Sequence, residues 1–297
     1  GKRKIGENYP PFVIAEIGIN HNGSLEKAKR MIRDVKKAGA ECVKFQGHVL
    51  EDEMLESEAR KTIPANSKVS IWEVMARCAL SEKQEQELKK FAERLGLIFL
   101  STPFSRAAAD RLQKMGVKAF KIGSGECNNY PLVEHVARFR KPMIVSTGMN
   151  DIAAVRRTVA ILREHKTPFA LLQCTNIYPT PWNRVYLGAI AKIKKAFPDA
   201  VVGLSNHSGG PWAALGAVAL GASVLERHFT SDRSWRGEDI PVSMDPAELK
   251  MVIQGSRAIW ESRGDYKGPV PEEKPTIDFA FASVVTIAPV AAGERFT

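Results

Sequence analysis

Two stretches of sequence decide the fold: AVVGLSNH at residues 200–207 and SVLERHFT at residues 223–230. Each is a short apolar run of the strand type with a histidine at or near its end, His207 or His228. Six comparable runs precede them, at residues 12–18, 41–46, 97–103, 119–125, 142–148 and 169–175. Segments with the apolar spacing of helices separate the runs, for example at residues 25–38, 105–115, 151–165 and 211–220.

An alternation of strand and helix repeated eight times is typical of an α/β protein whose parallel sheet closes into a (β/α)8 TIM barrel. An open doubly wound sheet is the alternative, but eight strands within about 250 residues favour the barrel. The chain has 297 residues, of which 44% are hydrophobic, and can bury one large core. We therefore expect a barrel catalytic domain over residues 1–263.

Three further segments flank or interrupt this pattern. Residues 47–80 place acidic, turn-rich sequence inside the second strand–helix unit, which predicts a lid or substrate wall on the catalytic face. Residues 264–278 are expected to be a linker, because their first part is rich in Gly, Pro and charged residues. Residues 279–297 are expected to begin a further, β-rich domain.

Composition narrows the expected location and partners. No apolar stretch is long enough to span a membrane, and the basic N-terminus GKRK lacks the apolar segment of a signal peptide. The four cysteines have no C-x-x-C spacing, which favours reduced thiols and a cytoplasmic protein. The net charge of +10 is spread over helical lysines without a nucleic-acid motif. We expect no nucleic-acid or membrane partner, and a positive potential that attracts a small anionic substrate.

Polar side chains gather where the expected strands end, which in a barrel is the catalytic mouth. Lys44 and Lys121 are the most informative, since lysine is rarely buried without a partner. Hydroxyl side chains lie at neighbouring strand ends: Thr102, Ser124 and Ser146. Together they predict a pocket for phosphate, or for phosphate and carboxylate. The alternative is structural, with Lys44 paired to Glu16 or Glu126 and Lys121 reaching towards solvent at its strand end.

His207 and His228 end consecutive strands and so predict a divalent-metal site, because neutral imidazoles are common metal ligands. The alternative is a pair of core histidines whose ring nitrogens bind carbonyls or carboxylates.

Six motifs point to a family: AEIGINHNG at residues 15–23, VKFQ at 43–46, STPF at 101–104, FKIGS at 120–124, VSTGM at 145–149 and ERHFT at 226–230. With these motifs the chain resembles the sialic acid synthase family, N-acetylneuraminate synthase and its relatives, over residues 12–246. The resemblance implies a TIM barrel followed by an antifreeze-like (SAF) domain, in domain-swapped homodimers. It also implies condensation of phosphoenolpyruvate with N-acetylmannosamine or a related amino sugar, with a divalent metal: Mn²⁺ first, Mg²⁺ or Co²⁺ as alternatives.

The resemblance also implies roles for individual residues. It places phosphoenolpyruvate on Lys44, Thr102, Lys121, Ser124, Ser146, Asn176 and Ser205. It places the sugar against Gln46, Tyr178, Asp239 and Phe281, the last near a position that caps the partner's sugar pocket. Its metal ligands correspond to His207 and His228. Glu16 matches an acidic residue at the reacting centre, and we expect Glu16, Lys121 and Glu126 to be catalytic.

The chain departs from the family at two motifs. The family commonly has Ser-Asp-His where this chain has Ser205-Asn206-His207, and Gly-Pro-Asp where it has Gly237-Glu238-Asp239. The first departure removes a negative charge next to His207, and the second lies next to Asp239, the expected sugar contact. The family's SAF domain also supplies an arginine to the partner's site, and no residue here matches that arginine.

Three hypotheses about function follow. The first is a synthase that makes a nonulosonic acid from phosphoenolpyruvate and an N-acylated amino sugar. The second is the same reaction with a 6-phosphorylated sugar. The third, from another class, is a catalytically silent barrel that binds sugar or scaffolds a partner.

Overall fold

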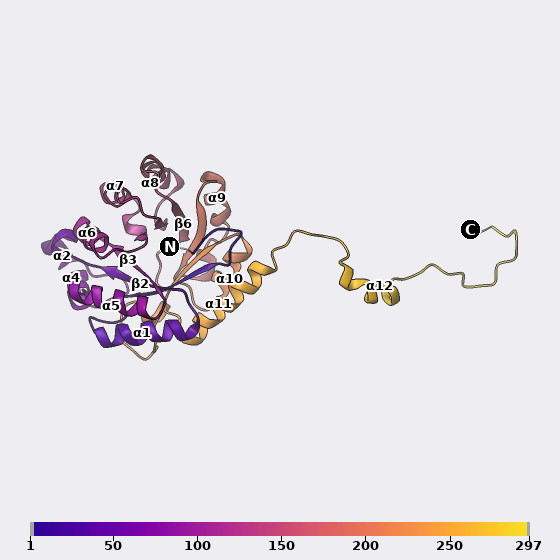
Figure 1. Ribbon diagram of the computed structural model, residues 1–297, viewed down its shortest axis with the longest axis horizontal. Helices are drawn as coiled ribbons and strands as arrows, with labels where there is room; N and C mark the ends of the chain where they lie inside the picture. The colour runs from indigo at the N-terminus through magenta and orange to yellow at the C-terminus, as the bar shows by residue number, and fades with distance from the viewer. Residues whose placement is uncertain (1–2, 296–297) are drawn as a thin grey trace. The chain divides into compact units, whose positions relative to one another are not determined.

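The computed structural model describes residues 3–295 and contains one barrel of eight parallel strands ringed by helices (Figure 1). The strands are β1 (Phe12–Gly18), β2 (Cys42–Gly47), β3 (Ile98–Pro103), β4 (Phe120–Ile122), β5 (Met143–Ser146), β6 (Phe169–Cys174), β7 (Val201–Asn206) and β8 (Val224–His228). Hydrogen-bonded neighbours run in the order β3-β2-β1-β8-β7-β6-β5-β4. β3 and β4 lie side by side and complete the circle. The predicted TIM barrel is therefore confirmed, because an open sheet would leave β3 and β4 apart as its two edges, whereas here they are in contact.

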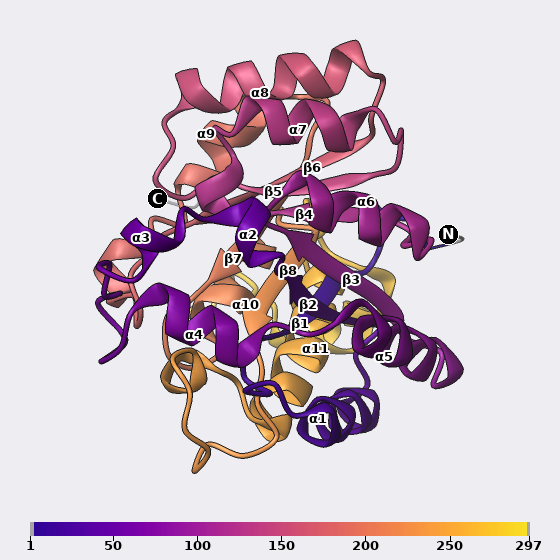
Figure 2. The same ribbon diagram turned by 90° about the vertical axis from the view of Figure 1, so that its left-hand side faces the viewer.

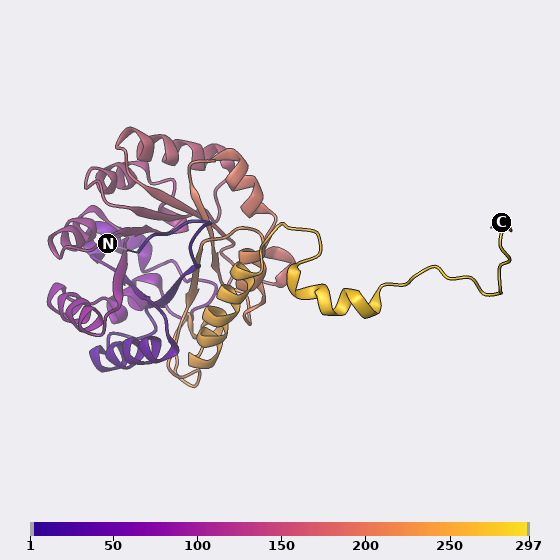
Figure 3. The same cartoon turned by 45° about the vertical axis from the view of Figure 1, so that its right-hand side comes forward.

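Helices cover the outside of the barrel, as Figure 3 shows from α1 in indigo to α11 in orange. They are α1 (Leu25–Ala38), α5 (Glu82–Arg94), α6 (Arg106–Lys114), α7 (Tyr130–Ala137), α8 (Ile152–Glu164), α9 (Ala189–Ala196), α10 (Trp212–Ala219) and α11 (Pro246–Glu261). Several begin where the sequence provides a side-chain cap. Ser24 and Ser105, for example, accept hydrogen bonds from backbone N–H groups at the starts of α1 and α6.

Two apolar layers follow from the alternation of side chains along each strand. One face of the strands fills the barrel interior, with Ile14, Leu100 and Leu172 among its buried residues. The other face packs against the helices. Space inside is so limited that a Cβ on Gly203 would lie 2.3 Å from the backbone oxygen of Val224. The interior is a packed core, so polar chemistry is confined to its ends.

The segment between β2 and α5 folds into three short helices, α2 (Leu50–Glu53), α3 (Glu56–Ala59) and α4 (Ile71–Cys78), which Figure 2 shows grouped together. α4 begins with a capping box, in which Ser70 accepts from the Glu73 N–H and the Glu73 carboxylate accepts from the Ser70 N–H. The side chain of Asp52 accepts a hydrogen bond from the Ala107 N–H, at the start of α6. The insertion is thereby fixed near the C-terminal end of β3.

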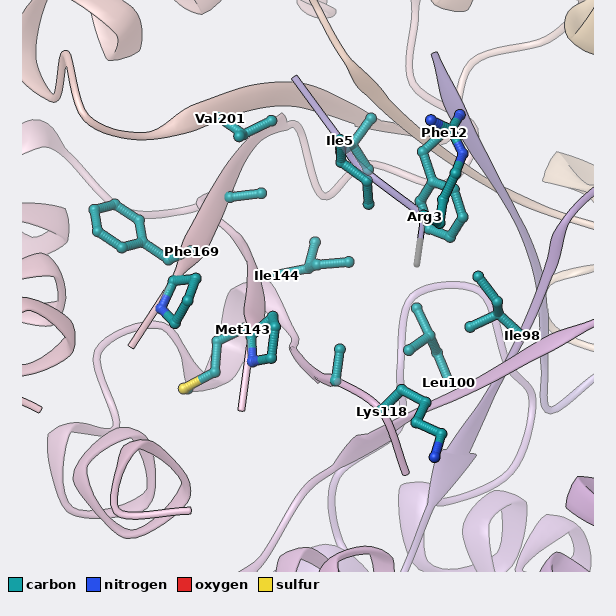
Figure 4. A pocket seen from close by; sticks show the side chains of 15 residues that line it. Arg3, Ile5, Phe12, Ile98, Leu100, Lys118, Met143, Ile144, Phe169 and Val201 are labelled. Atoms are coloured by element: carbon teal, nitrogen blue, oxygen red, sulfur yellow. The ribbon is translucent and has the colours of Figure 1, made fainter. Parts of the chain in front are cut away.

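The opposite end of the barrel holds an apolar cavity of about 290 Å³ (Figure 4). Ile98, Leu100 and Ile144 are among its lining side chains, and the cations among its described lining residues are Arg3 and Lys118. Arg3 is already paired with Glu41 at 2.8 Å. The described lining includes no carboxylate, imidazole, thiol or hydroxyl, so its ionisable side chains are limited to these two cations. Within residues 3–295, no helix combines the length and the apolar character needed to cross a membrane.

Contacts divide the chain into two units after Arg263. The second unit contains the short 3₁₀ turn η4 (Pro271–Glu273) and α12 (Lys274–Ala280). Residues 281–295 contain no strand. The β-rich domain expected from residue 279 onward therefore stays a prediction. Residues 296 and 297 lie outside the described part of the chain. Phe281 is 72% exposed in this unit.

Candidate active site

The C-terminal ends of the barrel strands surround a cavity of about 140 Å³. Twelve of the residues expected in the site line it: Glu16, Lys44, Gln46, Thr102, Lys121, Ser124, Ser146, Asn176, Tyr178, Ser205, His207 and His228. They come from the barrel strands or from the loops that follow the strands. Their convergence follows from the fold, since parallel strands in a barrel all end on the same side.

The two-residue period of a strand explains which side chains face inward. Along β1, Ile14 belongs to the interior layer, and Glu16 lies one step further on the same face. Lys44 and Gln46 in β2 repeat this spacing, as do Glu226 and His228 in β8. Charged residues therefore form the last inward layer, above the apolar core.

Lys44 is buried between two carboxylates and a hydroxyl. Its Nζ lies 2.9 Å from Glu16 Oε1 and 3.7 Å from Glu226 Oε1, and it donates to Thr102 Oγ1 at 2.8 Å. Burial alone would lower the pKa of Lys44, but the two carboxylates outweigh it and raise the pKa. Lys44 is therefore held as a cation.

Lys121 lies on the other side of Glu226, 3.5 Å from its Oε1. It donates to Ser146 Oγ at 2.8 Å and to the carbonyl of Ile122 at 3.0 Å. Burial lowers its pKa, and the attraction of Glu226 only partly offsets this effect. The pKa of Glu226 is lowered, because Lys121 and Lys44 outweigh the desolvation of its carboxylate.

N–H and hydroxyl groups line the same cavity as Lys121. Ser124 belongs to the 3₁₀ turn η1 (Ser124–Glu126), and its Oγ accepts a hydrogen bond from the Gly148 N–H at 3.1 Å. A Cβ at Gly148 would lie 2.1 Å from Asn176 Oδ1, so only glycine lets these groups meet. Hydroxyl and amide side chains thus line the cavity together with the two lysine ammonium groups, and such groups are the ones that can hold an anion.

His207 and His228 face each other across the rest of the cavity, with ring centroids 5.5 Å apart. His207 Nδ1 is 3.0 Å from the carbonyl oxygen of Thr175, so Nδ1 is the protonated nitrogen and Nε2 keeps its lone pair. Burial, followed by the neighbouring His228, lowers the pKa of His207 to about 3. The ring is neutral at physiological pH. Tyr178 stacks on it, with ring centroids 4.0 Å apart.

Several polar atoms here are buried without a hydrogen-bond partner: Glu16 Oε2, Glu226 Oε2 and His228 Nδ1. Asp239 Oδ2 is 3.5 Å from this His228 nitrogen, just beyond a hydrogen bond. Buried polar atoms without partners are costly unless a ligand, an ion or water satisfies them. In residues 3–295, no three His, Cys, Asp or Glu side chains are grouped as a metal site. Two imidazoles beside free carboxylate oxygens nevertheless fit a divalent metal that also takes ligands from substrate or water.

Three of the expected residues do not line this cavity. Glu126 is half-buried, and its Oε2 accepts from Asn129 Nδ2 at 2.6 Å. Asp239 is buried behind His228. Phe281 belongs to the second unit.

Sequence reasoning also missed lining residues, namely Phe104, Cys174 and above all Glu226. The signal for Glu226 was available: an acidic residue inside an apolar strand, two positions before His228 and therefore on the same face.

Comparison with known proteins agrees with this geometry. The model of the NeuB family matches residues 31–268. Human N-acetylneuraminate-9-phosphate synthase is 38% identical over 88% of this chain and 74% of its own length. The N,N'-diacetyllegionaminic acid synthase of Campylobacter jejuni is 36% identical over 96% of this chain and 87% of its own.

A solved relative has the same fold. The crystal structure of N-acetylneuraminic acid synthetase from Leptospira borgpetersenii, in complex with citrate, superposes with a TM-score of 0.84 and 31% identity over 94% of each chain. The family model covers more than half of the chain. This protein therefore belongs to the NeuB family of sialic acid and related nonulosonic acid synthases.

Proposed function

We propose that this enzyme condenses phosphoenolpyruvate with the open-chain aldehyde of an N-acylated amino sugar such as N-acetylmannosamine. The reaction adds water, releases phosphate and gives a nine-carbon nonulosonic acid. The observation that carries the proposal is the division of one cavity into two parts. Two lysines and several hydroxyls lie on one side, and two histidines beside free carboxylate oxygens lie on the other.

The lysine side suits phosphoenolpyruvate, which carries a phosphate and a carboxylate. Lys44 and Lys121 supply two ammonium groups beneath the two anionic groups. Hydroxyl and amide groups are available to orient the ligand: Thr102, Ser124, Ser146, Asn176 and Ser205. The site already holds Glu16 and Glu226 as counterions, so the substrate exchanges partners with them when it binds.

The histidine side suits the sugar. Gln46 and Tyr178 reach the cavity with polar groups that can bind hydroxyls, and Asp239 lies behind His228. His207 and His228 would hold the metal, for which Mn²⁺ is the first choice and Mg²⁺ or Co²⁺ are alternatives. When bound, such a metal acts as a Lewis acid that polarises the aldehyde.

The residues of the chain can then guide the reaction. A bond forms between the methylene carbon of phosphoenolpyruvate and the aldehyde carbon, and positive charge develops on the carbon that bears phosphate. The Glu16 carboxylate faces this centre with one oxygen unpaired, so it can stabilise the charge and orient the water that adds there. A proton from that water passes to Glu16 and is made up at the former aldehyde oxygen, which gains a proton and becomes a hydroxyl. The tetrahedral adduct then expels phosphate beside Lys121, and its hydroxyl proton leaves with the phosphate to give a 2-keto acid.

The direct test is phosphate release from phosphoenolpyruvate in the presence of amino sugars, with and without added Mn²⁺. We expect release to require both the sugar and the metal, and to be lost in Glu16→Gln. Tight sugar binding without any phosphate release in the metal-replete enzyme would favour the silent barrel instead.

We also propose that residues 264–278 link the barrel to an SAF-like domain that begins at residue 279, and that the protein works as a homodimer. The support is a run of large apolar side chains exposed in the second unit: Phe279, Phe281, Val284, Val285 and Ile287. Such a run is costly in water unless another surface covers it. Light scattering after size exclusion should show a dimer that Phe281→Ser weakens, and a monomer at all concentrations would contradict this proposal.

A further inference from the structure

His48 is buried just outside the active-site cavity, in contact with two side chains that line it. It follows the last residue of β2 and is only 4% exposed. Its ring stacks on Phe104, with centroids 4.7 Å apart and an angle of 12° between the planes. Its Nε2 lies 3.1 Å from Gln46 Oε1. Phe104 and Gln46 line the cavity, and His48 does not. A buried imidazole in this position needs partners for both of its ring nitrogens.

Both ring nitrogens of His48 face oxygen atoms that accept hydrogen bonds. Nδ1 lies 2.8 Å from Oε2 of Glu53, the last residue of α2, and the carboxylate accepts the proton of this nitrogen. Nε2 faces the carbonyl oxygen of the Gln46 amide, which can only accept. Both contacts are hydrogen bonds when both nitrogens carry a proton, and Glu53 then supplies the countercharge.

The Gln46 amide joins His48 to the reacting centre. Its Nε2 donates to Glu16 Oε1 at 3.3 Å, and the same oxygen lies 2.9 Å from Lys44 Nζ. If the amide turned over, its carbonyl oxygen would face the Glu16 carboxylate, and two acceptors in contact repel each other. The chain from Glu53 through His48 and Gln46 to Glu16 therefore pairs a donor with an acceptor at every link in one orientation of the amide only.

The Gln46 amide also lies close to the proposed metal site. A Cβ placed on Gly18 would lie 3.3 Å from Gln46 Nε2, 3.3 Å from Glu16 Oε1 and 3.4 Å from His228 Nδ1. These three atoms therefore converge on one corner of the cavity. Gln46 Nε2 carries two N–H groups, and one of them donates to Glu16. The other is left for a hydroxyl of a ligand in this corner.

We propose that His48 is a positioning residue, which holds the Gln46 amide with its N–H groups turned towards Glu16 and the cavity, where the second N–H binds the sugar. The inference rests on the proposed function, since it assumes that the amino sugar lies between Gln46 and the histidines. Glu53 in turn fixes the His48 ring from the insertion after β2. A side chain that already has its binding orientation loses less rotamer entropy when the ligand arrives.

Two amide substitutions at His48 separate this role from a structural one. The amide nitrogen of glutamine is as many bonds from Cα as Nε2 of histidine, and that of asparagine as many as Nδ1. His48→Gln therefore keeps a donor for Gln46 and loses the donor to Glu53, whereas His48→Asn does the reverse. We expect His48→Asn to raise the sugar's KM about tenfold, the effect of losing one hydrogen bond, and His48→Gln to raise it about threefold or less. The kcat and the KM of phosphoenolpyruvate should stay near those of the parent.

Two further measurements show whether His48 acts through Gln46. In a Gln46→Leu background, His48→Asn should raise the sugar's KM no further, because the side chain that it positions is gone. The side-chain amide NMR resonances of Gln46, assigned by their loss in Gln46→Leu, should shift more in His48→Asn than in His48→Gln. His135→Asn is the matched control and should change neither the KM nor the resonances. His135 lies on α7, 2.7 Å from Asp110 and edge-on to Phe139, and does not line the cavity.

Each outcome decides the question. A larger rise in the sugar's KM for His48→Asn than for His48→Gln, which disappears with Gln46→Leu, supports the inference. A larger effect of His48→Gln, no effect of either variant, or an effect of His48→Asn that persists with Gln46→Leu overturns it. The proposed function still stands in these cases, because the parent releases phosphate. If the parent releases no phosphate with N-acetylated amino sugars, the proposed function fails for them and the resonances decide. A larger shift in His48→Asn then supports the positioning role, and equal or absent shifts refute it.

Discussion

Replacing Lys121 by methionine separates the role of this lysine in binding from its role in the fold. Lys121 is only 2% exposed, and its ammonium group donates to Ser146 and Ile122 and faces Glu226. Methionine keeps most of the side-chain volume but removes the charge and both hydrogen bonds. We expect phosphoenolpyruvate affinity and protein stability to fall for different reasons.

The loss of affinity follows from one charge-assisted hydrogen bond to an anionic group, which contributes about 1.5–3 kcal/mol. Phosphoenolpyruvate should therefore bind roughly 10- to 150-fold more weakly, since 1.4 kcal/mol is about tenfold in affinity. The loss of stability arises because Glu226 is left with Lys44, at 3.7 Å, as its lysine partner. Breaking a buried ion pair costs about 3–5 kcal/mol, and the remaining partner should bring the cost towards the lower end of that range.

The double variant Lys121→Met/Glu226→Gln tells these effects apart. It restores the balance of one lysine to one glutamate, so urea denaturation should show a partial recovery of stability. Calorimetric titration of phosphoenolpyruvate should show no recovery of affinity. If Lys121→Met binds phosphoenolpyruvate as tightly as the parent, or if the double variant regains its affinity, Lys121 serves only to neutralise Glu226 and does not bind the substrate anion.

Three other predictions follow from the structure. Chelation, or His207→Ala, should abolish phosphate release, and chelation should leave the urea midpoint unchanged because a site at the mouth of a packed barrel adds little to the core; activity that survives chelation would exclude the metal. Phosphoenolpyruvate affinity should fall as pH rises, beginning below the usual lysine pKa of 10.5, because burial lowers the pKa of Lys121 and the binding form is the protonated one. In Lys121→Arg this alkaline loss should disappear, and a titration series that shows the same decline in both proteins would assign it to another group. Gly203→Ala should lower the free energy of unfolding by about 3 kcal/mol, since its Cβ would clash with the Val224 backbone oxygen. Gly188→Ala is the control and should leave the free energy of unfolding unchanged, because its Cβ meets no atom within 4 Å. Equal urea midpoints for the two variants would contradict this prediction.

The barrel and most of the site could be predicted from sequence because both depend on local patterns. Apolar runs identified the strands, and polar residues at their ends identified the mouth. The positions of side chains were harder to predict where a turn changes the direction of the chain. Residues 119–125 were expected to form one strand, but β4 ends at Ile122, and the turn that follows carries Glu126 to Asn129 and out of the cavity lining. The role expected for Glu126 stays a prediction.

A second cavity of about 700 Å³, which we call the distal cleft, is lined by residues that include Asn66, Arg77 and Glu238, and it could not be predicted from the sequence at all. Asn66 and Glu238 are 172 positions apart, and neither belongs to a regular element whose period would point to a shared face. Their meeting depends on how the insertion after β2 folds against the loop after β8. Isolated lysines and arginines in such loops have the composition of an ordinary solvated surface, so only the assembled structure shows that they surround one hollow.

The different origins of the two cavities also have a consequence for how such an enzyme diversifies. The reacting groups project from strand ends that are fixed by the packing of the barrel core, as the close approach at Gly203 illustrates. The distal cleft is made largely by loops and one short helix, whose side chains can change without disturbing that core. Substitutions at positions such as Lys68 and Arg236 can therefore reshape this second cavity while the strand ends that surround the first cavity stay in place. A lineage built on this scaffold can thus vary one surface hollow through small steps, each of which leaves the barrel folded.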